Sequence, residues 1–165
     1  MKQKKVFLMS GPPVSGKSTW VRSKLLPGSE WISRDNVRFA IVSEDEEYFS
    51  HEDEVFDTFI DYINQYLDDD VTDTLFIDAT HLNEKSRHKT LSRVHREKIT
   101  QLNSVCFSTS VAECCLRNYY REGRERVPDS VIRNMFESYK LPTAKEGFDH
   151  VYVVDREGKM EEVKV

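Results

Sequence analysis

The chain has 165 residues, of which 38% are hydrophobic and 32% charged, with a formal net charge of −5. This length fits one domain over residues 1–165. A membrane helix needs an apolar run of roughly 20 residues, and the chain has none near that length. The sequence therefore excludes a membrane-spanning protein and predicts no membrane partner. The charge is segregated: residues 41–73 hold thirteen Asp or Glu and no Lys or Arg, so the remainder carries +8 and leaves a positive face for an anionic partner.

Apolar runs typical of buried strands alternate with helical patterns along the chain. The expected strands cover residues 6–9, 30–33, 75–77, 104–107 and 151–154. The expected helices cover residues 19–26, ended by Pro27-Gly28, residues 51–67, residues 83–94 with Asn83 as the N-cap, and a last helix that starts near residue 128. Strands that alternate with helices pair in parallel through right-handed crossovers, so the pattern predicts an α/β fold with a mostly parallel sheet and helices on both faces.

The segment between the first strand and the first helix carries a phosphate-binding motif. Residues 11–19 read Gly-Pro-Pro-Val-Ser-Gly-Lys-Ser-Thr and match G-x-x-x-x-G-K-[ST]. Glycines let backbone N–H groups face inward around a phosphate, and the start of the following helix adds partial positive charge. We expect Lys17 to reach the β- and γ-phosphates of ATP and the Ser18 hydroxyl to ligate Mg²⁺. The residues expected to bind ATP in this segment are Gly11, Pro13, Ser15, Gly16, Lys17, Ser18 and Thr19.

A carboxylate that can activate an acceptor alcohol follows the second strand. Asp35 lies in Ser-Arg-Asp-Asn-Val-Arg at residues 33–38. The carboxyl ends of parallel strands face one crevice, so Asp35 is placed opposite the phosphates, where it can act as general base. Arg34 and Arg38 flank it as candidate acceptor-binding residues, and Arg38, one helical turn on, can bind an anionic group. The alternative is Asp35 as a helix N-cap and Arg38 as a solvated surface residue.

Four arginines concentrate in residues 117–126, between two helical patterns. A loop of this kind that closes over the transferred phosphate supplies the positive charge that phosphoryl transfer requires and expels water. We therefore predict a lid over approximately residues 117–130. The alternative is a charged, solvated helix end in which Glu122 and Glu125 pair with the arginines.

A third polar group follows the apolar strand at residues 75–77. Asp78 ends this strand, as a carboxylate that organises Mg²⁺ often does in P-loop proteins. Thr80 and Asn83 follow it and are expected to bind the backbone or the acceptor. The alternative is that Asp78 only stabilises the loop.

The three cysteines, Cys106, Cys114 and Cys115, show no Cys-x-x-Cys spacing. Neither a disulfide framework nor a zinc site is indicated, and two adjacent cysteines in a helical pattern are typical of packing residues. We therefore expect a reducing compartment, the cytoplasm.

Four segments together resemble the kinase domain of the bacteriophage polynucleotide 5′-kinase/3′-phosphatase family. They are residues 11–19, residues 33–38, Asp-Ala-Thr-His-Leu-Asn at residues 78–83 and residues 117–128. The resemblance covers nearly the whole chain, in order, and implies a three-layer P-loop kinase fold with an arginine-bearing lid. The Asp-x-Asp-Gly-Thr motif that opens the family's phosphatase domain is missing here, so we expect the kinase part alone.

The resemblance also implies roles for individual side chains. Asp35 is then the general base for a 5′-hydroxyl, Arg38 contacts the acceptor phosphate, and Arg117 and Arg121 bind the ATP phosphates. The lid is one residue longer here than in the family, so Arg124 competes with Arg121 for the catalytic position.

These observations predict an ATP- and Mg²⁺-dependent kinase whose acceptor is the 5′-hydroxyl of a DNA or RNA end. In that case the nucleic-acid strand is expected to bind to Arg34, Arg38 and residues 87–98, and the acidic residues 44–73 are expected to face away from it. Two alternatives stay open. One is a kinase of a nucleoside, sugar or other small molecule, and the other is a non-enzymatic binding module switched by ATP. The oligomeric state is undetermined.

Overall fold

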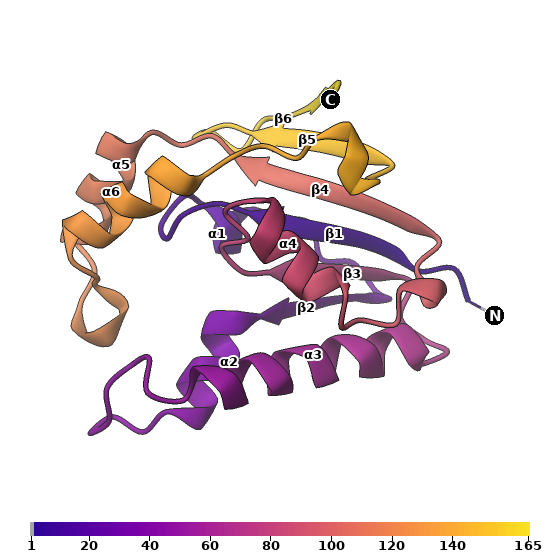
Figure 1. Ribbon diagram of the computed structural model, residues 1–165, viewed down its shortest axis with the longest axis horizontal. Coiled ribbons are helices and arrows are strands. Elements are labelled where there is room, and N and C mark those ends of the chain that lie inside the picture. Colours follow the sequence, from indigo (N-terminus) through magenta and orange to yellow (C-terminus); the bar gives the residue numbers. More distant parts are fainter. Residues whose placement is uncertain (1) are drawn as a thin grey trace.

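A six-stranded sheet in the order β2-β3-β1-β4-β5-β6 forms the centre of the molecule (Figure 1). The structure is a computed structural model and describes residues 2–165. The first five strands in this order pair in parallel, and β6 pairs antiparallel to β5. The strands are β1 (Lys5–Ser10), β2 (Ser29–Ser33), β3 (Thr74–Asp78), β4 (Gln101–Phe107), β5 (His150–Val154) and β6 (Met160–Val163). The five parallel strands are those that the apolar runs predict, and the predicted α/β class is confirmed.

Helices connect the parallel strands. They are α1 (Lys17–Arg22), α2 (Arg34–Ile41), α3 (Glu52–Asp68), α4 (Glu84–Leu91), α5 (Val111–Tyr119) and α6 (Asp129–Ser138), with short 3₁₀ turns at Arg96–Lys98, Gly123–Glu125 and Ala144–Glu146. Asn83 caps α4 as predicted, through a reciprocal pair of hydrogen bonds with Ser86. The first helix was predicted too long, since α1 ends at Arg22 and Pro27-Gly28 instead forms the turn into β2.

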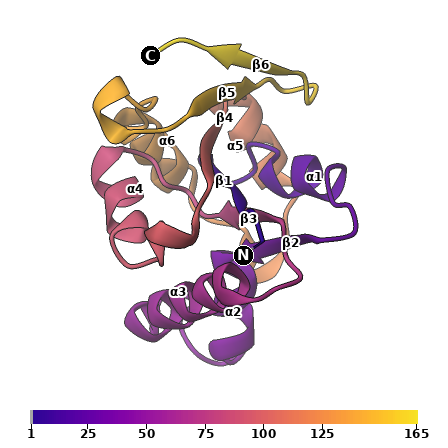
Figure 2. The same cartoon turned by 90° about the vertical axis from the view of Figure 1, so that its right-hand side faces the viewer.

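The two faces of the sheet are covered unequally (Figure 2). Along β1, Val6 and Leu8 point to one face, where α2, α3 and α4 cover the larger core. Met9 points to the other face, where Trp20 of α1 packs edge-on against Phe107 and completes a smaller core. Successive strand residues point to opposite faces, so this continuous apolar run serves two helical layers.

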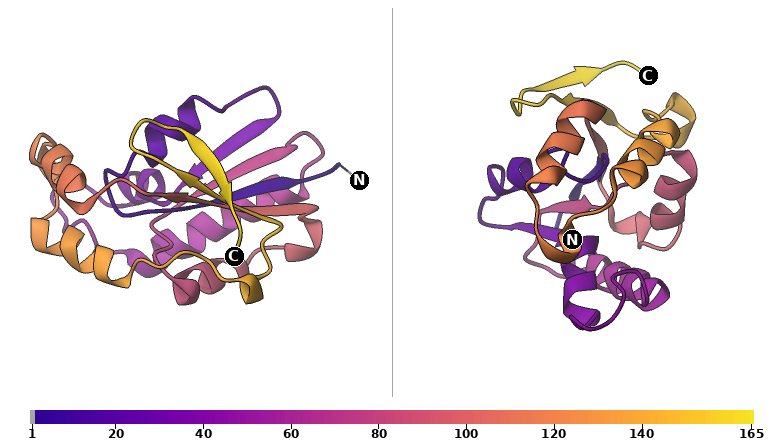
Figure 3. Two further views of the ribbon diagram at one scale, coloured as in Figure 1. Left: turned by 90° about the horizontal axis from the view of Figure 1, so that it is seen from above. Right: turned by 90° about the vertical axis from the view of Figure 1, so that its left-hand side faces the viewer.

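The fifth and sixth helices lie beyond the carboxyl ends of the strands (Figure 3). Cys114, Cys115 and Ile132 form a separate small core between α5 and α6, and Val14 of the phosphate loop packs against it. The three cysteines are buried and unpaired. This helix pair is therefore attached directly to the phosphate loop, and the predicted lid connects its two members.

Two further differences from the predictions concern the chain end and the acidic segment. The polar strand β6 was not predicted, because residues 160–163 lack an apolar pattern and pair only at the sheet edge. The prediction that the acidic segment faces away from the site is wrong for the start of this segment, because Tyr48, Phe49 and Glu52 line a cavity beside the phosphate loop. Within residues 2–165, no helix is long and apolar enough to cross a membrane.

Candidate active site

The phosphate loop has the backbone that its sequence predicts. Gly16 has φ 102°, which favours glycine, and Val14 also has a positive φ of 59°. A Cβ atom at Gly11 would lie 2.7 Å from the Ser15 hydroxyl oxygen and 3.2 Å from Cβ of Phe107, so a larger residue there would displace one of these side chains. The loop is held in place from outside, because the Thr109 hydroxyl donates to the Ser15 carbonyl at 2.9 Å. These contacts preform a tight turn at the start of α1.

Two buried groups of this loop fit a phosphate. The Lys17 ammonium donates to the carbonyls of Gly11 (2.8 Å) and Pro12 (3.0 Å). Burial lowers the pKa of Lys17, while the charges of Asp78 and Asp35 oppose this shift. The Ser15 hydroxyl oxygen is buried and has no hydrogen-bond partner among residues 2–165. A bound phosphate would supply both a counter-charge and an acceptor, so the residues present fit a nucleoside triphosphate.

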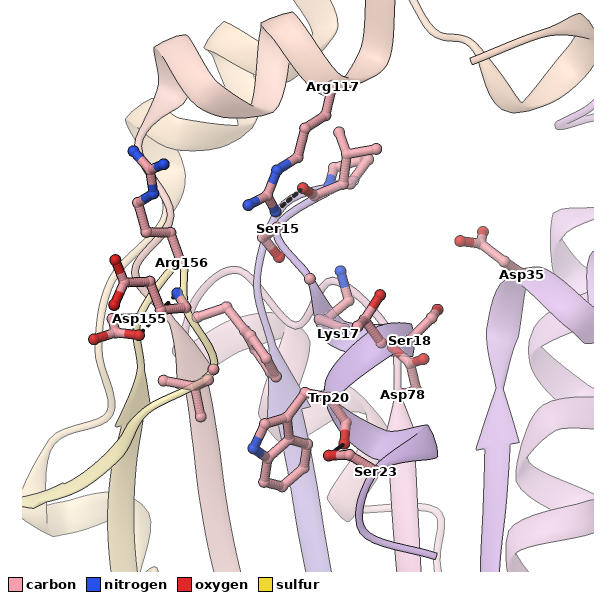
Figure 4. Close-up of a pocket in the computed structure, with 18 of the residues that line it drawn as sticks. Ser15, Lys17, Ser18, Trp20, Ser23, Asp35, Asp78, Arg117, Asp155 and Arg156 are labelled. Atoms are coloured by element: carbon pink, nitrogen blue, oxygen red, sulfur yellow. Dashed lines mark hydrogen bonds between the residues drawn. The ribbon is translucent and has the colours of Figure 1, made fainter. Parts of the chain in front are cut away.

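The cavity around the loop has a volume of about 610 Å³ (Figure 4). Besides the predicted Pro13, Ser18 and Thr19, it is lined by Trp20, Phe107 and the β5–β6 turn at residues 155–158. Sequence reasoning missed these last residues. The apolar side chains of Trp20 and Phe107 suit a nucleoside. The β5–β6 turn is far from α1 in the sequence, and only the tertiary structure brings the two together.

The lid arginines point in different directions. Arg117 lies over the phosphate loop and donates to the Val14 carbonyl at 3.2 Å, as Figure 4 shows. Arg121 lines the same cavity. Arg124 instead donates to the carbonyls of Val42 (3.1 Å) and Ser43 (2.8 Å) at the end of α2. The structure therefore brings Arg117 and Arg121 to the phosphate loop but not Arg124, which ties the lid to the neighbouring loop.

Asp35 lies in the first turn of α2, across the cavity from the phosphate loop, and its carboxylate points toward that loop (Figure 4). The N-cap of α2 is Ser33, whose hydroxyl accepts from the Asn36 N–H at 3.2 Å. The alternative that Asp35 is the N-cap is therefore wrong. Its side chain is 65% exposed, so its carboxylate is accessible to a second substrate.

A second cavity of about 250 Å³ adjoins the first. Tyr48 and Phe49 form its aromatic wall, and Thr80 lines it as predicted for an acceptor-binding residue. Asn83 does not line this cavity, because its side chain is used to cap α4. Five residues line both cavities, namely Pro13, Lys17, Asp35, Asp78 and Arg121. The two cavities therefore meet where Asp35, the predicted base, lies opposite Lys17, the predicted phosphate-binding residue.

The arginines beside Asp35 are paired with a carboxylate that sequence reasoning missed. Glu52 accepts from Arg38 Nε (2.5 Å) and Nη2 (2.9 Å), and from Arg34 Nη2 (3.1 Å). Arg38 is 6% exposed, so the alternative that it is a solvated surface residue is wrong. The second cavity thus holds two arginines whose charge is partly compensated by Glu52.

The predicted magnesium ligands lie in one place. Ser18 and Asp78 both line the first cavity, and Figure 4 shows them side by side near Lys17. Trp31 Nε1 donates to Oδ2 of Asp78 at 3.0 Å, so the other carboxylate oxygen is available. Within residues 2–165, no three His, Cys, Asp or Glu residues are grouped as a metal site. This arrangement fits Mg²⁺, which is commonly held by one or two protein ligands together with substrate phosphates.

The basic segment at residues 87–98 does not form a continuous nucleic-acid surface. Arg87 is 1% exposed and its Nε donates to Glu146 at 2.7 Å. Arg93 is paired with Asp57 at 3.0 Å. The prediction that this whole segment binds a nucleic-acid strand is wrong for Arg87. Its side chain instead attaches the loop before β5 to α4.

The parallel sheet and the phosphate loop define a P-loop protein of the kinase type. The chain belongs to the AAA domain family, whose sequence profile matches residues 6–142. No curated protein sequence matches the chain.

Solved structures share this fold at low sequence identity. A sugar kinase from Janibacter sp. superposes with a TM-score of 0.63 and 16% identity, covering 94% of this chain and 87% of that one. Kti12 from Chaetomium thermophilum, in complex with ADP-AlF3, gives a TM-score of 0.62 and 14% identity, with 91% and 88% covered. A fungal RNA kinase gives 0.57 and 18%, with 93% and 75% covered. A gluconokinase from Sinorhizobium meliloti gives 0.57 and 17%, with 94% and 84% covered. These similarities establish a P-loop kinase fold, and the kinases among them differ in their acceptors.

Proposed function

We propose that the protein transfers the γ-phosphate of ATP to an acceptor hydroxyl, with Asp35 as general base. One observation carries this proposal: the phosphate-loop cavity and the aromatic-walled cavity share Lys17, Asp35, Asp78 and Arg121. A group bound in the smaller cavity reaches the γ-phosphate only at this junction. Transfer to an alcohol needs such a second cavity for the acceptor, whereas hydrolysis of ATP needs room only for water.

In the proposed step, the acceptor oxygen bonds to the γ-phosphorus and its proton passes to Asp35. The bond from the γ-phosphorus to the β–γ bridging oxygen breaks, and ADP leaves with that oxygen. Lys17 and Arg121 stabilise the charge that spreads over the transferred group. Ser18 and Asp78 would hold Mg²⁺ together with the phosphates, and the bound ion would supply further charge neutralisation.

For the acceptor we propose the 5′-hydroxyl of a DNA or RNA end. The sequence resemblance supports this acceptor, and the exposed ring of Phe49 in the aromatic wall offers a surface on which a terminal base can stack. A structural neighbour is described as an RNA kinase, which agrees with this acceptor at the level of the fold.

A small polyhydroxylated acceptor is the second candidate, and Glu52 favours it. Because Glu52 compensates the charge of Arg34 and Arg38, little free positive charge is left for an acceptor phosphate. The cavity volume of about 250 Å³ also suits a sugar or nucleoside. Neighbours described as a sugar kinase and a gluconokinase agree with this alternative.

Labelled ATP with Mg²⁺, offered in parallel to 5′-hydroxyl DNA and RNA oligomers, a 3′-nucleotide and a panel of sugars and nucleosides, identifies the acceptor. A nucleic-acid acceptor predicts a severalfold gain in kcat/KM between one and about four nucleotides, lost at high salt, because each neutralised phosphate releases counterions. Sugars labelled as well as oligomers, without salt dependence, would establish the second candidate. Absence of transfer to any alcohol would favour a binding module switched by ATP.

The base is tested by Asp35→Asn. The amide still accepts a hydrogen bond but takes no proton, so kcat should fall by about 10² or more while ATP affinity stays unchanged. Near-normal turnover of this folded variant would refute the assignment.

A further inference from the structure

The two carboxylate oxygens of Asp35 have different surroundings. Arg38 Nη1 donates to Oδ1 at 2.5 Å, and the Tyr48 hydroxyl donates to the same oxygen at 3.4 Å. No hydrogen bond from residues 2–165 reaches Oδ2. One oxygen is therefore held by the protein, and the other is free to accept from an acceptor hydroxyl.

Arg38, which holds Asp35, is itself immobilised. All three guanidinium nitrogens donate to carboxylates, Nη1 to Asp35, and Nε and Nη2 to Glu52. The guanidinium carbon also lies 5.0 Å from the ring centres of both Tyr48 and Phe49. A two-point contact to Glu52 fixes the plane of the guanidinium group, and this plane sets the direction of the bond to Asp35.

Glu52 is positioned by the long helix α3. It is the first residue of α3, and the rest of this helix is anchored in the large core by Phe56 and Phe59. Burial raises the pKa of Glu52, but the hydrogen bond and the charge of Arg38 outweigh burial and hold the pKa below its usual value. Glu52 is therefore ionised at neutral pH, and its charge compensates that of the buried Arg38.

We propose that Glu52 is a positioning residue for phosphoryl transfer: it orients Arg38, and Arg38 presents Oδ2 of Asp35 to the acceptor. This role rests on the proposed function, since it requires that Asp35 is the base. It also assigns Arg38 to orienting Asp35, in place of the acceptor phosphate predicted from the sequence.

A double-mutant cycle between Glu52→Gln and Asp35→Asn tests the proposal. Glu52→Gln keeps the size of the side chain but removes the charge and one acceptor oxygen, so we expect kcat to fall about tenfold with little change in KM for ATP. In the Asp35→Asn background the same substitution should change kcat less than about twofold, because the orientation of Asp35 no longer matters. Glu52→Asp should restore part of the loss.

Glu54→Gln is the matched control. Glu54 lies in the same first turn of α3, and its side chain is 63% exposed. The control therefore reports the effect of losing one negative charge at this end of the helix. It should leave kcat unchanged. Equal losses from Glu52→Gln in the wild-type and Asp35→Asn backgrounds would overturn the positioning role, as would an effect on KM for ATP alone. If Asp35→Asn itself keeps normal turnover, the proposed base fails first, and the two failures are distinguished within one experiment.

Discussion

Acidification should destabilise the protein through His81, which is 3% exposed at the carboxyl edge of the sheet. Its Nδ1 donates to the Met9 carbonyl at 2.8 Å, and its Nε2 accepts from the Thr90 hydroxyl at 2.8 Å. The donor to a carbonyl must carry the proton, so the neutral ring satisfies both partners. Burial, together with the nearby charges of Arg34, Arg87 and Lys17, lowers the pKa of His81 to about 4, although the bond to Met9 opposes this shift.

The size of this destabilisation follows from the difference between the pKa of His81 in the unfolded chain and in the folded protein. The unfolded chain takes up a proton near pH 6.5 and the folded protein only near pH 4, so the unfolded state binds more protons between these values. The free energy of unfolding therefore falls as the pH is lowered through this window. One unit of pKa difference is worth about 1.4 kcal/mol, so His81 should account for a loss of about 2.5 kcal/mol at about pH 4.5, rising to a limit of about 3.5 kcal/mol well below pH 4.

Urea denaturation at a series of pH values, compared with His81→Asn, measures this loss. Asn places an amide donor near the position of Nδ1 and tolerates the positive φ of 39° at this site. The variant should be less stable at neutral pH because it lacks the bond to Thr90. Its free energy of unfolding should then fall less steeply from pH 6.5 to 4.5, since carboxylates that titrate in both proteins cancel in the difference. Equal slopes in the two proteins would refute the reasoning.

Three other predictions concern the phosphate loop, the lid and one turn. Lys17→Ala should lower kcat by at least about 10², because it removes a cation from the transferred phosphate, and near-normal kcat in a folded variant would contradict the phosphate-loop assignment. Arg121→Ala should lower kcat strongly, whereas Arg124→Ala should chiefly raise KM for the acceptor by loosening the lid. Steady-state kinetics separates the two, and equal small effects would mean that both are surface charges. Gly28→Ala should lower the free energy of unfolding by about 1–2 kcal/mol or more in urea denaturation, because Gly28 has φ 88° and an added Cβ would lie 2.5 Å from Asp73 Oδ2. An unchanged midpoint would show that the turn adjusts without strain.

Local sequence determined the parts of this protein that depend on neighbouring residues. The phosphate loop has glycine at Gly16, where φ is 102°, and at Gly11, where an added Cβ would crowd the Ser15 side chain, and both positions lie within residues 11–19. The central parallel strands carry apolar runs because both of their faces are covered, and these runs reveal the strands without knowledge of their partners, although the signal is weaker in β2. The position of Asp35 at the carboxyl end of β2 follows from the same pattern.

Only the tertiary structure decided which charged groups meet. Glu52 lies 14 residues beyond Arg38, and nothing in the local pattern distinguishes it from the other acidic residues at the start of α3. The directions of Arg121 and Arg124 likewise depend on how the lid turns. Local periodicity reports whether a side chain is buried, but the partner of a buried charge depends on the packing of whole helices against the sheet. The sequence therefore predicted the phosphate loop and the position of Asp35 opposite it, and the packing of α3 decided how Asp35 is held.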